Sequence, residues 1–586
     1  MAVLLRRRIQ EILSRLQCYF VGRRSFCWLA CIGICLCVQL VWTAWHATPN
    51  VDEVGLLAAG VHHWTEGRFD LYRVNPPLVK LAASLPIVLM HPKFDWSNVR
   101  NTIGARTEWQ VGNDFLKANP GRVMDFFRVA RLCVLPFSLL GMVVCFLWGR
   151  ELWGDNAGLF SAALWCFSPT VVTWSSTITS DVPAAALGAG ASYLFWKHCR
   201  SGWTQYGSAA GAAIGFACLA KVTCLILFPF WLSWVLIVGQ GSWPIRRRSV
   251  ATITVVAILI INVGYCFEGT FNRLGDFVFV SRCLAGQDSL LDGGQGGNVS
   301  SESWLGSIPV PLPANMLIGI DLQKLDFERG TSNFLMGEWK IGGWWYYYAI
   351  AFMVKEPVGT LLLILLATVA LFRRDSADAV LRQGKWMPCI LGVAIFVLVS
   401  SQTGICRYLR YLLPAFPFLY IWIAGTVRNA ASTWQKSVAW LCLGWSALSP
   451  LTAVPHSLTF FNELAGGSRW GHYIVADANI DWGHDYGYLK AWIEQHDNAR
   501  PICIDLLPIA DLQPLGLDKY ETTLQLHIRL RNPRLVPEGW YAISAHRMHI
   551  DDDFHRFFLN KEPFQIIGGS VYIFQVRESK FLGESD

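Results

Sequence analysis

The sequence predicts a polytopic α-helical membrane protein with a small α/β domain at its C-terminal end. Hydrophobic residues make up 53% of the 586 residues and charged residues only 16%, whereas soluble domains carry about a quarter charged residues. Many apolar runs approach the roughly 20 residues that a membrane-spanning helix needs. Residues 477–586 differ, because they are charged and contain short alternating runs at 501–507, 540–544 and 570–576, which predict strands.

The apolar runs predict about eleven spans. The first run, Phe26–Trp45, is long for a signal peptide and lacks a clear cleavage site, so we interpret it as a retained anchor. The basic residues 1–25 before it are expected in the cytoplasm. The predicted spans lie at 26–45, 127–148, 156–174, 181–197, 205–220, 222–239, 249–267, 344–372, 386–402, 408–427 and 436–454.

The basic residues test this topology. Spans that alternate from a cytoplasmic N-terminus leave every second loop inside, and short inside loops are enriched in Lys and Arg. The odd number of spans places the C-terminus outside, and the net charge of +7 need not indicate nucleic acid. Each predicted inside loop carries basic residues: Arg150, then Lys197 and Arg200, then Arg246–Arg248, then Arg373, Arg374, Arg382 and Lys385, then Arg428 and Lys436.

Three regions follow from this topology: a cytoplasmic N-terminus at 1–25, a transmembrane domain at 26–454 and an extracytoplasmic domain at 455–586. The first outer loop, 46–126, is expected to hold juxtamembrane helices. The outer loop 268–343 is rich in Gly and Pro, and we interpret it as a mobile lid or acceptor-binding loop. Most of the 17 cysteines lie in apolar runs, where they act as small hydrophobic residues, and no Cys or His spacing indicates a zinc site.

The adjacent carboxylates Asp52 and Glu53 follow the first span directly. Carboxylates at a membrane surface are costly to desolvate, so their presence there indicates a function. A structural alternative is that Asn50 or Asp52 simply caps the helix predicted over 54–66. Both roles are compatible with one another.

Several outer-face motifs together resemble the GT-C superfamily of polyprenyl-phosphate-dependent glycosyltransferases. These motifs are the acidic pair, the step Asn75-Pro76-Pro77-Leu78, the outward Asp181-Val182-Pro183 and the late segment RYLRYLLPAFPF. The similarity is greatest to the protein O-mannosyltransferase and aminoarabinose lipid A transferase branches. Residues 461–492 also resemble a stretch of bacterial members. The resemblance implies a GT-C fold.

The resemblance implies that the acidic pair supplies the catalytic base. Inverting transfer needs a base that takes the proton of an acceptor hydroxyl as it attacks the anomeric carbon. We expect Asp52 in this role, with Glu53 as a neighbour or acceptor ligand.

The proline step is expected to form a turn and to start a second outer helix. At the position of Asn75, the aminoarabinose transferases carry a lysine and the mannosyltransferases a histidine. Arg73 or Lys80 could supply the missing charge, or the step could be a structural turn only.

Four further residues are expected to bind substrate. Asp181 could line the substrate pocket or merely cap its helix. Lys355 interrupts an apolar stretch, and Arg407 and Arg410 lie outside against the charge rule, so each could bind the leaving phosphate. Alternatively, Lys355 could pair with Glu356 or extend outward, and the two arginines could contact lipid headgroups.

Two polar groups leave their roles open. His62 and His63 follow the acidic pair on the next helical turns, so a metal corner with Glu53 is conceivable. A His pair more often lies on a solvated helix face, so we expect no metal, and a divalent metal stays the alternative. In the tail, Asp477, Asp481, His484 and Asp485 surround Trp482 and could bind a sugar or an acceptor, or serve as turn and capping residues.

The resulting hypothesis is a membrane glycosyltransferase that moves a sugar from a polyprenyl-phosphate-linked donor to a lipid, glycan or protein acceptor, at the outer face of an inner (plasma) membrane. One alternative is an oligosaccharide ligase or polymerase on the same fold. Another is a lipid or sugar transporter, although no inverted repeat is visible and the charge gathers on one face. A third is a non-catalytic scaffold that binds a partner through its tail.

Overall fold

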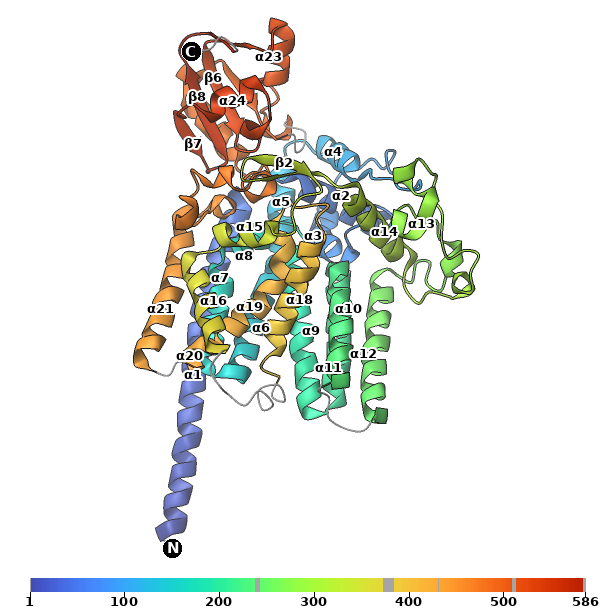
Figure 1. Cartoon of the computed structure of the whole chain (residues 1–586), viewed down its shortest axis with the longest axis vertical. Helices are drawn as coiled ribbons and strands as arrows, with labels where there is room; N and C mark the ends of the chain where they lie inside the picture. The colour runs from blue at the N-terminus through green and yellow to red at the C-terminus, as the bar shows by residue number, and fades with distance from the viewer. Residues whose placement is uncertain (1, 238–242, 372–383, 430–431, 508–512, 583–586) are drawn as a thin grey trace.

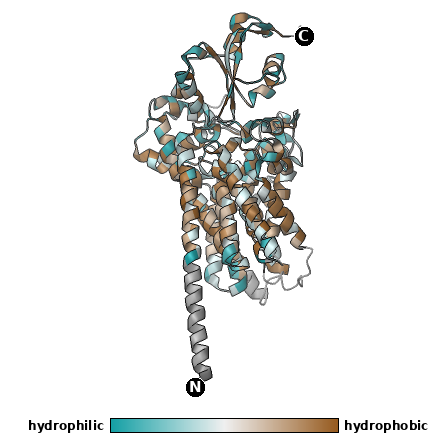
Figure 2. Ribbon diagram, turned by 90° about the vertical axis from the view of Figure 1, so that its left-hand side faces the viewer, coloured by the Kyte–Doolittle hydropathy of each residue, from teal (hydrophilic) through white to brown (hydrophobic). Residues whose placement is uncertain are grey.

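The computed structural model describes residues 2–237, 243–371, 384–429, 432–507 and 513–582. A bundle of helices forms the body of the molecule (Figure 1). Helix α1, Ala2–His46, runs along the bundle and projects beyond it at the N-terminal end, while the C-terminal residues lie at the opposite end. We call that opposite end the outer end, following the predicted topology. Figure 2 shows that hydrophobic residues predominate along the bundle helices.

Each predicted span coincides with helical residues. Two of them begin as 3₁₀-helices, η1 (Val222–Ile226) and η6 (Leu409–Ala415). The helices of the bundle are α5 (Val123–Leu132), α6 (Leu135–Trp153), α7 (Asp155–Phe167), α8 (Pro169–Ser175), α9 (Asp181–Ser201), α10 (Thr204–Ala220), α11 (Leu227–Ile237), α12 (Trp243–Gly264), α15 (Tyr347–Lys355), α16 (Val358–Leu371), α18 (Met387–Ser401), α19 (Phe416–Ile423), α20 (Gly425–Asn429) and α21 (Thr433–Leu448).

Prolines bend two of the predicted spans. The axes of α7 and α8 differ by 63° across the break before Pro169, and those of α15 and α16 by 118° across the break at Pro357. Proline lacks the amide hydrogen that continues a helix and disfavours helical geometry in the residue before it. The segments 156–174 and 344–372 are therefore not the straight spans that hydropathy alone predicts.

Fewer than eleven helices are both long enough and apolar enough to cross a membrane, within the residues that the structure describes. Within the described residues, Arg24–His46 and Val123–Trp153 are long and apolar enough to cross a membrane, and counting each bent pair as one span gives up to four. Further apolar helices, such as Met387–Ser401, are shorter. The predicted count of eleven therefore stays a prediction.

Basic residues predicted to be cytoplasmic lie together at the inner end of the bundle. Lys197, near the end of α9, pairs with Glu151 of α6 at 3.0 Å. The ammonium group of Lys385 lies 5.4 Å from the ring centre of Trp153, the last residue of α6. The predicted basic residues 373, 374 and 382 lie outside the described residues.

The first outer loop is largely helical. It contains α2 (Val51–Glu66), α3 (Pro77–Leu89) and α4 (Glu108–Ala118). Helices α2 and α3 touch closely at Gly60, where a Cβ atom would lie 2.3 Å from the carbonyl oxygen of Lys80. This close contact fixes the start of α3 against α2.

The loop 268–343 has more regular structure than its Gly and Pro content suggests. It contains α13 (Arg282–Ala285), α14 (Ala314–Arg329) and the antiparallel hairpin of β1 (Ser332–Leu335) and β2 (Glu338–Ile341), besides short 3₁₀ turns. Phe277, Phe279 and Ala285 form a small core of its own.

The C-terminal residues form a five-stranded mixed sheet of order β4-β3-β6-β8-β7. The three alternating runs coincide with β3 (Ile502–Asp505), β6 (Gly539–Ser544) and β8 (Val571–Val576). Strand β3 is parallel to β4 and β6, whereas β8 is antiparallel to β6 and β7. The other elements are α22 (Tyr486–Gln495), α23 (Thr523–Leu530), α24 (Asp553–Leu559), β4 (Glu521–Thr522), β7 (Gln565–Ile567) and the pair β5 (Leu535–Val536) and β9 (Lys580–Phe581).

Candidate active site

The start of α2 separates the two adjacent carboxylates. Asn50 is the N-cap: its side chain accepts from the backbone N–H of Glu53 at 3.1 Å, and the Glu53 carboxylate accepts from the backbone N–H of Asn50 at 3.0 Å. This reciprocal pair is a capping box. The capping role therefore falls to Asn50 and Glu53, and Asp52 is free to point elsewhere.

Glu53 is fully buried and held by Arg131 of α5. The guanidinium donates to both carboxylate oxygens, at 2.6 and 2.8 Å, and both side chains have 0% exposure. The same carboxylate accepts from the backbone N–H of Ile178 at 2.8 Å, and Arg131 also donates to the carbonyls of Ala44 and Ala47. Glu53 thus ties α1, α2, α5 and the corner before α9 together. These contacts do not fit the expectation that Glu53 is catalytic or binds the acceptor.

Asp52 lies at the centre of a cluster of polar and aromatic side chains. One carboxylate oxygen pairs with Arg410 of η6 at 2.5 Å and accepts from the indole N–H of Trp482 at 3.3 Å. The other accepts from the hydroxyl of Tyr72 at 3.3 Å. The Asp52 side chain is 14% exposed, so it remains accessible. The sequence separates these partners by up to 430 positions.

Asp181 joins the same cluster from the start of α9. Its carboxylate pairs with Lys221, which follows α10, and lies 3.8 Å from Arg410 Nε. Beside it, the Ser180 hydroxyl donates to Asn75 at 3.3 Å. Arg410 Nε is buried without a hydrogen-bond partner. We refer to Asp52, Asp181, Lys221 and Arg410 as the charged cluster.

The charged cluster has no net formal charge, because its two carboxylates are matched by two cations. Aromatic rings surround these cations: the Arg410 guanidinium lies 4.6 Å from the ring centres of both Trp174 and Tyr408, and the Lys221 ammonium lies 4.6 Å from that of Tyr411. Cations bind the faces of such rings.

Tyr72 positions Asp52 from the turn before α3. Burial, followed by the nearby Asp52 carboxylate, raises the pKa of Tyr72 well above its ordinary value, so its hydroxyl keeps the proton that it donates. The residue has a left-handed backbone, with φ 56°, and its ring packs on Gly55, where a Cβ atom would lie 3.1 Å from the ring.

Arg407 lies at the edge of the charged cluster. It pairs with Asp477 of the tail at 3.3 Å and donates to the carbonyl of Ser332 in β1 at 3.0 Å. Its side chain is 27% exposed. Arg407 therefore connects the 407–410 corner to the tail and to the β1–β2 hairpin.

Lys355 does not reach the charged cluster. Its ammonium group donates to the carbonyls of Leu458 and of Asn479, the latter at 2.8 Å, and lies 4.1 Å from the ring centre of Phe461. The break between α15 and α16 directs Lys355 toward the tail. Glu356 is held separately by the hydroxyls of Thr170, at 2.8 Å, and two other residues. The expected phosphate contact of Lys355 does not fit this position.

The basic residues around the proline step are also engaged elsewhere. Arg73 donates to Asn315 of α14 at 2.6 Å and to Asn101. Lys80 is buried and donates to the carbonyls of Leu71 and Tyr72, at 3.2 and 3.1 Å. Lys80 therefore shapes the turn that carries Tyr72, and neither cation takes the place left by Asn75.

The predicted tail cluster divides into separate contacts. Asp477 meets Arg407, whereas Asp481 accepts from the backbone N–H of Gly483 and Asp485 accepts from Ser570 and contacts His456, each at 2.7 Å. The backbone carbonyl of His484 accepts from the N–H of Thr48, just after α1. Asp477 and His484 therefore attach the tail to the bundle, whereas the contacts of Asp481 and Asp485 lie within the tail. Of this segment, Trp482 alone among its described side chains contacts Asp52.

No metal-binding set is evident among the residues that the structure describes, since no three His, Cys, Asp or Glu side chains come together there. His62 lies 3.9 Å from Asp70, and the Nδ1–H of His63 donates to the carbonyl of Arg68 at 2.7 Å. Glu53, one helical turn or more before these histidines, is paired with Arg131.

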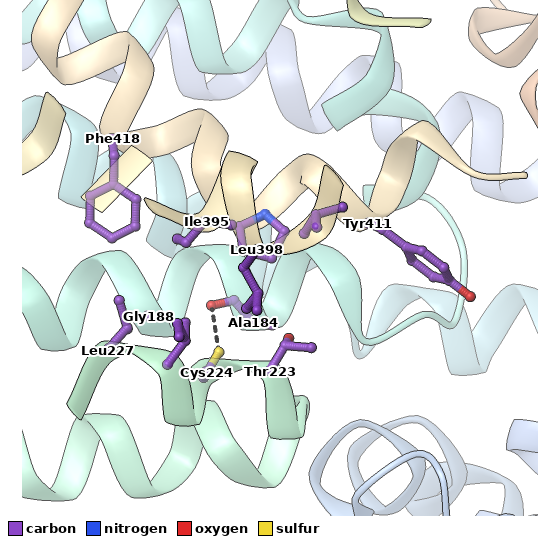
Figure 3. Close-up of a pocket in the computed structure, with 12 residues that line it drawn as sticks. Ala184, Gly188, Thr223, Cys224, Leu227, Ile395, Leu398, Tyr411 and Phe418 are labelled. Carbon is purple, nitrogen blue, oxygen red and sulfur yellow. Dashed lines mark hydrogen bonds between the residues drawn. The ribbon is translucent and has the colours of Figure 1, made fainter. Parts of the chain in front are cut away.

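A narrow apolar crevice with a cavity volume of about 20 Å³ lies between α9, η1, α11, η6, α18 and α19 (Figure 3). Tyr411 lies at one end of the labelled side chains and Phe418 at the other, and the Tyr411 hydroxyl points away from the crevice. The ring of Tyr411 is the one that contacts Lys221. The remaining lining is mainly aliphatic, including Leu227, Ile395 and Leu398.

Sequence reasoning missed Lys221, Arg131 and Tyr72. Lys221 is a lone cation between two apolar runs at the outer end, and Arg131 lies with Arg128 inside a predicted span. The principle that charges in a membrane segment are functional or paired could have identified both. No sequence signal marks Tyr72.

Comparisons with known proteins agree with the resemblance seen in the motifs. Residues 123–265 match the family model "Dolichyl-phosphate-mannose-protein mannosyltransferase". This match confirms the resemblance to the GT-C glycosyltransferases and supports a glycosyltransferase in general terms. No curated protein matches the chain in sequence.

Two solved membrane enzymes are similar in structure. ArnT from Cupriavidus metallidurans bound to undecaprenyl phosphate is 14% identical over 93% of this chain and 97% of that chain, with a TM-score of 0.45. The apo oligosaccharyltransferase from Archaeoglobus fulgidus is 13% identical over 82% of this chain and 62% of that chain, with a TM-score of 0.42.

Proposed function

We propose that this chain is a membrane glycosyltransferase that moves a sugar from a polyprenyl-phosphate-linked donor to an acceptor hydroxyl at the outer face of the membrane. The observation that carries the proposal is the charged cluster at the end of an apolar crevice. An amphiphilic donor needs both: cations for its phosphate and an apolar surface for its chain. The family-model match supports the same class of reaction.

Asp52 is the proposed base. It takes the proton of the acceptor hydroxyl while the acceptor oxygen bonds to the anomeric carbon and the bond from that carbon to the phosphate oxygen breaks, so the configuration inverts. The lipid phosphate leaves with the electron pair. Asp52 is favoured over Glu53 because it is accessible and makes only side-chain contacts, whereas Glu53 is buried in the Arg131 pair.

Arg410 and Lys221 are the proposed phosphate ligands. Both are paired with carboxylates, and Arg410 has an unused N–H donor. A bound phosphate would draw Arg410 away from Asp52. A carboxylate without a cationic neighbour is a stronger base, so donor binding would activate Asp52. Asn75 and Arg407 lie at the rim, where sugar or acceptor contacts are expected.

The apolar crevice is the proposed path of the polyprenyl chain. Its lining is mainly aliphatic, and Tyr411 joins it to Lys221. Its volume of about 20 Å³ is close to what one water molecule needs, so the surrounding helices would have to separate to admit an isoprene unit. The sugar would then lie between the phosphate ligands and Asp52, next to Trp482.

The test compares cells that lack the protein with cells carrying the wild type, Asp52→Asn, Arg410→Gln or Lys355→Met. Mass spectrometry of lipid extracts and outer-face glycans should show an accumulated polyprenyl-linked sugar and a missing glycan in the deletion. Wild type restores the glycan, and Asp52→Asn and Arg410→Gln do not. Protein level and melting temperature identify variants that fail to fold. Restoration by well-folded Asp52→Asn would refute the proposed base, and restoration by Arg410→Gln the phosphate site.

Lys355→Met distinguishes the two candidate phosphate sites. Its loss removes contacts to tail carbonyls, so we expect lower thermal stability with an unchanged dependence of rate on donor concentration. A selective rise in the donor KM of a stable Lys355→Met protein would return the phosphate contact to Lys355.

A further inference from the structure

A stripe of exposed apolar residues runs along α12 toward its outer end. Val255, Leu259 and Val263 are 64%, 51% and 54% exposed. Residues four positions apart lie on one side of a helix. A membrane-embedded α12 would place this side against lipid.

Two exposed aromatic residues lie in the loop that directly follows α12. Phe267 is 51% and Phe271 64% exposed. Both have left-handed backbones, with φ 60° and 68°, which side-chain-bearing residues rarely adopt. The turn is nevertheless fixed, because the N–H of Phe267 donates to the carbonyl of Asn262 at 2.8 Å and that of Phe271 to the carbonyl of Val310 at 2.9 Å. The fold thus holds two large apolar side chains outward in an unfavourable backbone conformation.

A second segment of the same loop adds to this surface. The N–H of Leu274 donates to the carbonyl of Ile308 at 2.9 Å, which places residues 304–308 alongside residues 271–274. Trp304 is 76%, Leu305 39% and Ile308 40% exposed. We refer to Phe267, Phe271, Trp304, Leu305 and Ile308 as the loop patch. In Figure 1 this loop projects sideways from the outer end of α12.

The exposure of the loop patch is not the result of a loop without a core. Phe277 and Phe279 of the same loop are 6% and 3% exposed and stack on one another at 5.8 Å. The loop therefore sorts its aromatic side chains into a buried set and an exposed set. Apolar patches of this kind mark a surface that something covers.

We propose that the loop patch inserts into the boundary between lipid headgroups and acyl chains. The lipid surface is favoured as its partner because the patch begins at Phe267, three residues after the end of α12, whose exposed apolar stripe a membrane would cover. Tryptophan and other aromatic residues are enriched at this boundary. The contact anchors one end of the loop in the membrane.

The other end of the loop bears on the charged cluster. Helix α14 follows the loop patch, and its Asn315 and Asp326 bind Arg73 and Arg106 of the first outer loop. That outer loop carries Tyr72, the partner of Asp52. Membrane contact at the loop patch would therefore hold α14 in place over the segment that positions the proposed base.

Photo-crosslinking tests the proposal. The full-length protein, with the photoreactive amino acid p-benzoylphenylalanine in place of Phe271 or Trp304, is reconstituted into vesicles of phosphatidylethanolamine and phosphatidylglycerol and irradiated. Leu259 on α12 is the matched membrane position, and Phe564, 57% exposed before β7, is the matched position on the C-terminal sheet. Intact-mass spectrometry detects phospholipid adducts, and melting temperature reports on folding.

Phospholipid adducts at positions 271 and 304 at a yield within about twofold of position 259, with at least tenfold less at 564, are expected. Adducts at 259 without adducts at 271 and 304 would overturn the proposal, as would crosslinks from 271 or 304 to a second protein chain. Adducts at none of the four positions would overturn it too, because α12 would then not face lipid. None of these outcomes depends on glycosyl transfer.

Discussion

Replacing each member of the acidic pair by its amide should separate chemistry from structure. Asp52→Asn and Glu53→Gln both remove one negative charge from adjacent positions of α2 and keep the side-chain shape. The structure predicts opposite dominant effects. Asp52 contacts groups in an accessible cluster, whereas Glu53 is the buried partner of Arg131.

The expected loss of stability is larger for Glu53→Gln. This change leaves the guanidinium of Arg131 buried at 0% exposure without its counter-charge, and removing one partner of a buried pair costs about 3–5 kcal/mol. In Asp52→Asn, Arg410 loses one charged hydrogen bond but keeps Asp181 at 3.8 Å, and such a bond contributes about 1.5–3 kcal/mol. The Asn50 cap is unaffected by Asp52→Asn.

The expected loss of turnover is larger for Asp52→Asn. An amide cannot accept the proton of the acceptor, and general-base catalysis contributes roughly 10²–10⁴-fold to rate. Glu53→Gln, once folded at low temperature, should retain much more activity per folded molecule. The residual loss would come from displaced helices, because Glu53 also holds the backbone N–H of Ile178.

The assay measures both quantities on the same preparations. Thermal unfolding in detergent gives the stability. For turnover, each variant is given lipid extracts of the deletion strain as the source of donor, and mass spectrometry measures the polyprenyl phosphate that is released. Glu66→Gln is the matched control, because Glu66 is exposed at the far end of α2; it should behave as wild type in both assays. Wild-type turnover by Asp52→Asn, or wild-type unfolding temperature of Glu53→Gln, would refute the division of roles.

Three further outcomes are expected. Tyr72→Phe should lower kcat by about 3–10-fold with little change in stability, since it removes one hydrogen bond to the proposed base; an unchanged kcat would contradict a positioning role. Burial, and then a neighbouring histidine, lowers the pKa of His472 to about 3 and that of His549 to about 4, so protons bind the unfolded state first and stability should fall as the pH drops below about 6.5. By pH 5 each histidine should cost on the order of 2 kcal/mol, measured by thermal unfolding, and the double His→Gln variant should show a flatter profile; equal slopes would contradict this origin. Reporter fusions after residue 245 should report cytoplasm and those after 480 the outside; a cytoplasmic signal at 480 would contradict the shared outer face.

The hydropathy of the sequence predicts the positions of the bundle helices well, because a run of apolar residues is a local property. It predicts their continuity less well. Pro169 and Pro357 bend two segments by 63° and 118°, and whether a proline bends a helix or ends it depends on what its neighbours can pack against. The alternation of residues likewise predicts β3, β6 and β8, but not their order in the sheet.

The sequence also predicts that an acidic pair and several outer-face cations matter, because charge beside an apolar segment is costly wherever it occurs. Asp52, Asp181 and Arg410 do come together. Lys355 is also a cation beside an apolar segment, but its partners are carbonyl oxygens of the tail. A buried ammonium group needs hydrogen-bond acceptors, and the sequence does not say which acceptors these are.

Which of two adjacent carboxylates faces the site was decided only by tertiary structure. Asp52 and Glu53 carry the same charge, and they differ by one position along α2, which is about 100° around a helix. That rotation directs Glu53 toward Arg131, 78 residues away, and Asp52 toward Arg410, 358 residues away. The sequence by itself determines which helices form and which charges need partners, since both follow from local chemistry. The pairing of those charges depends on how distant helices pack, which no local pattern encodes.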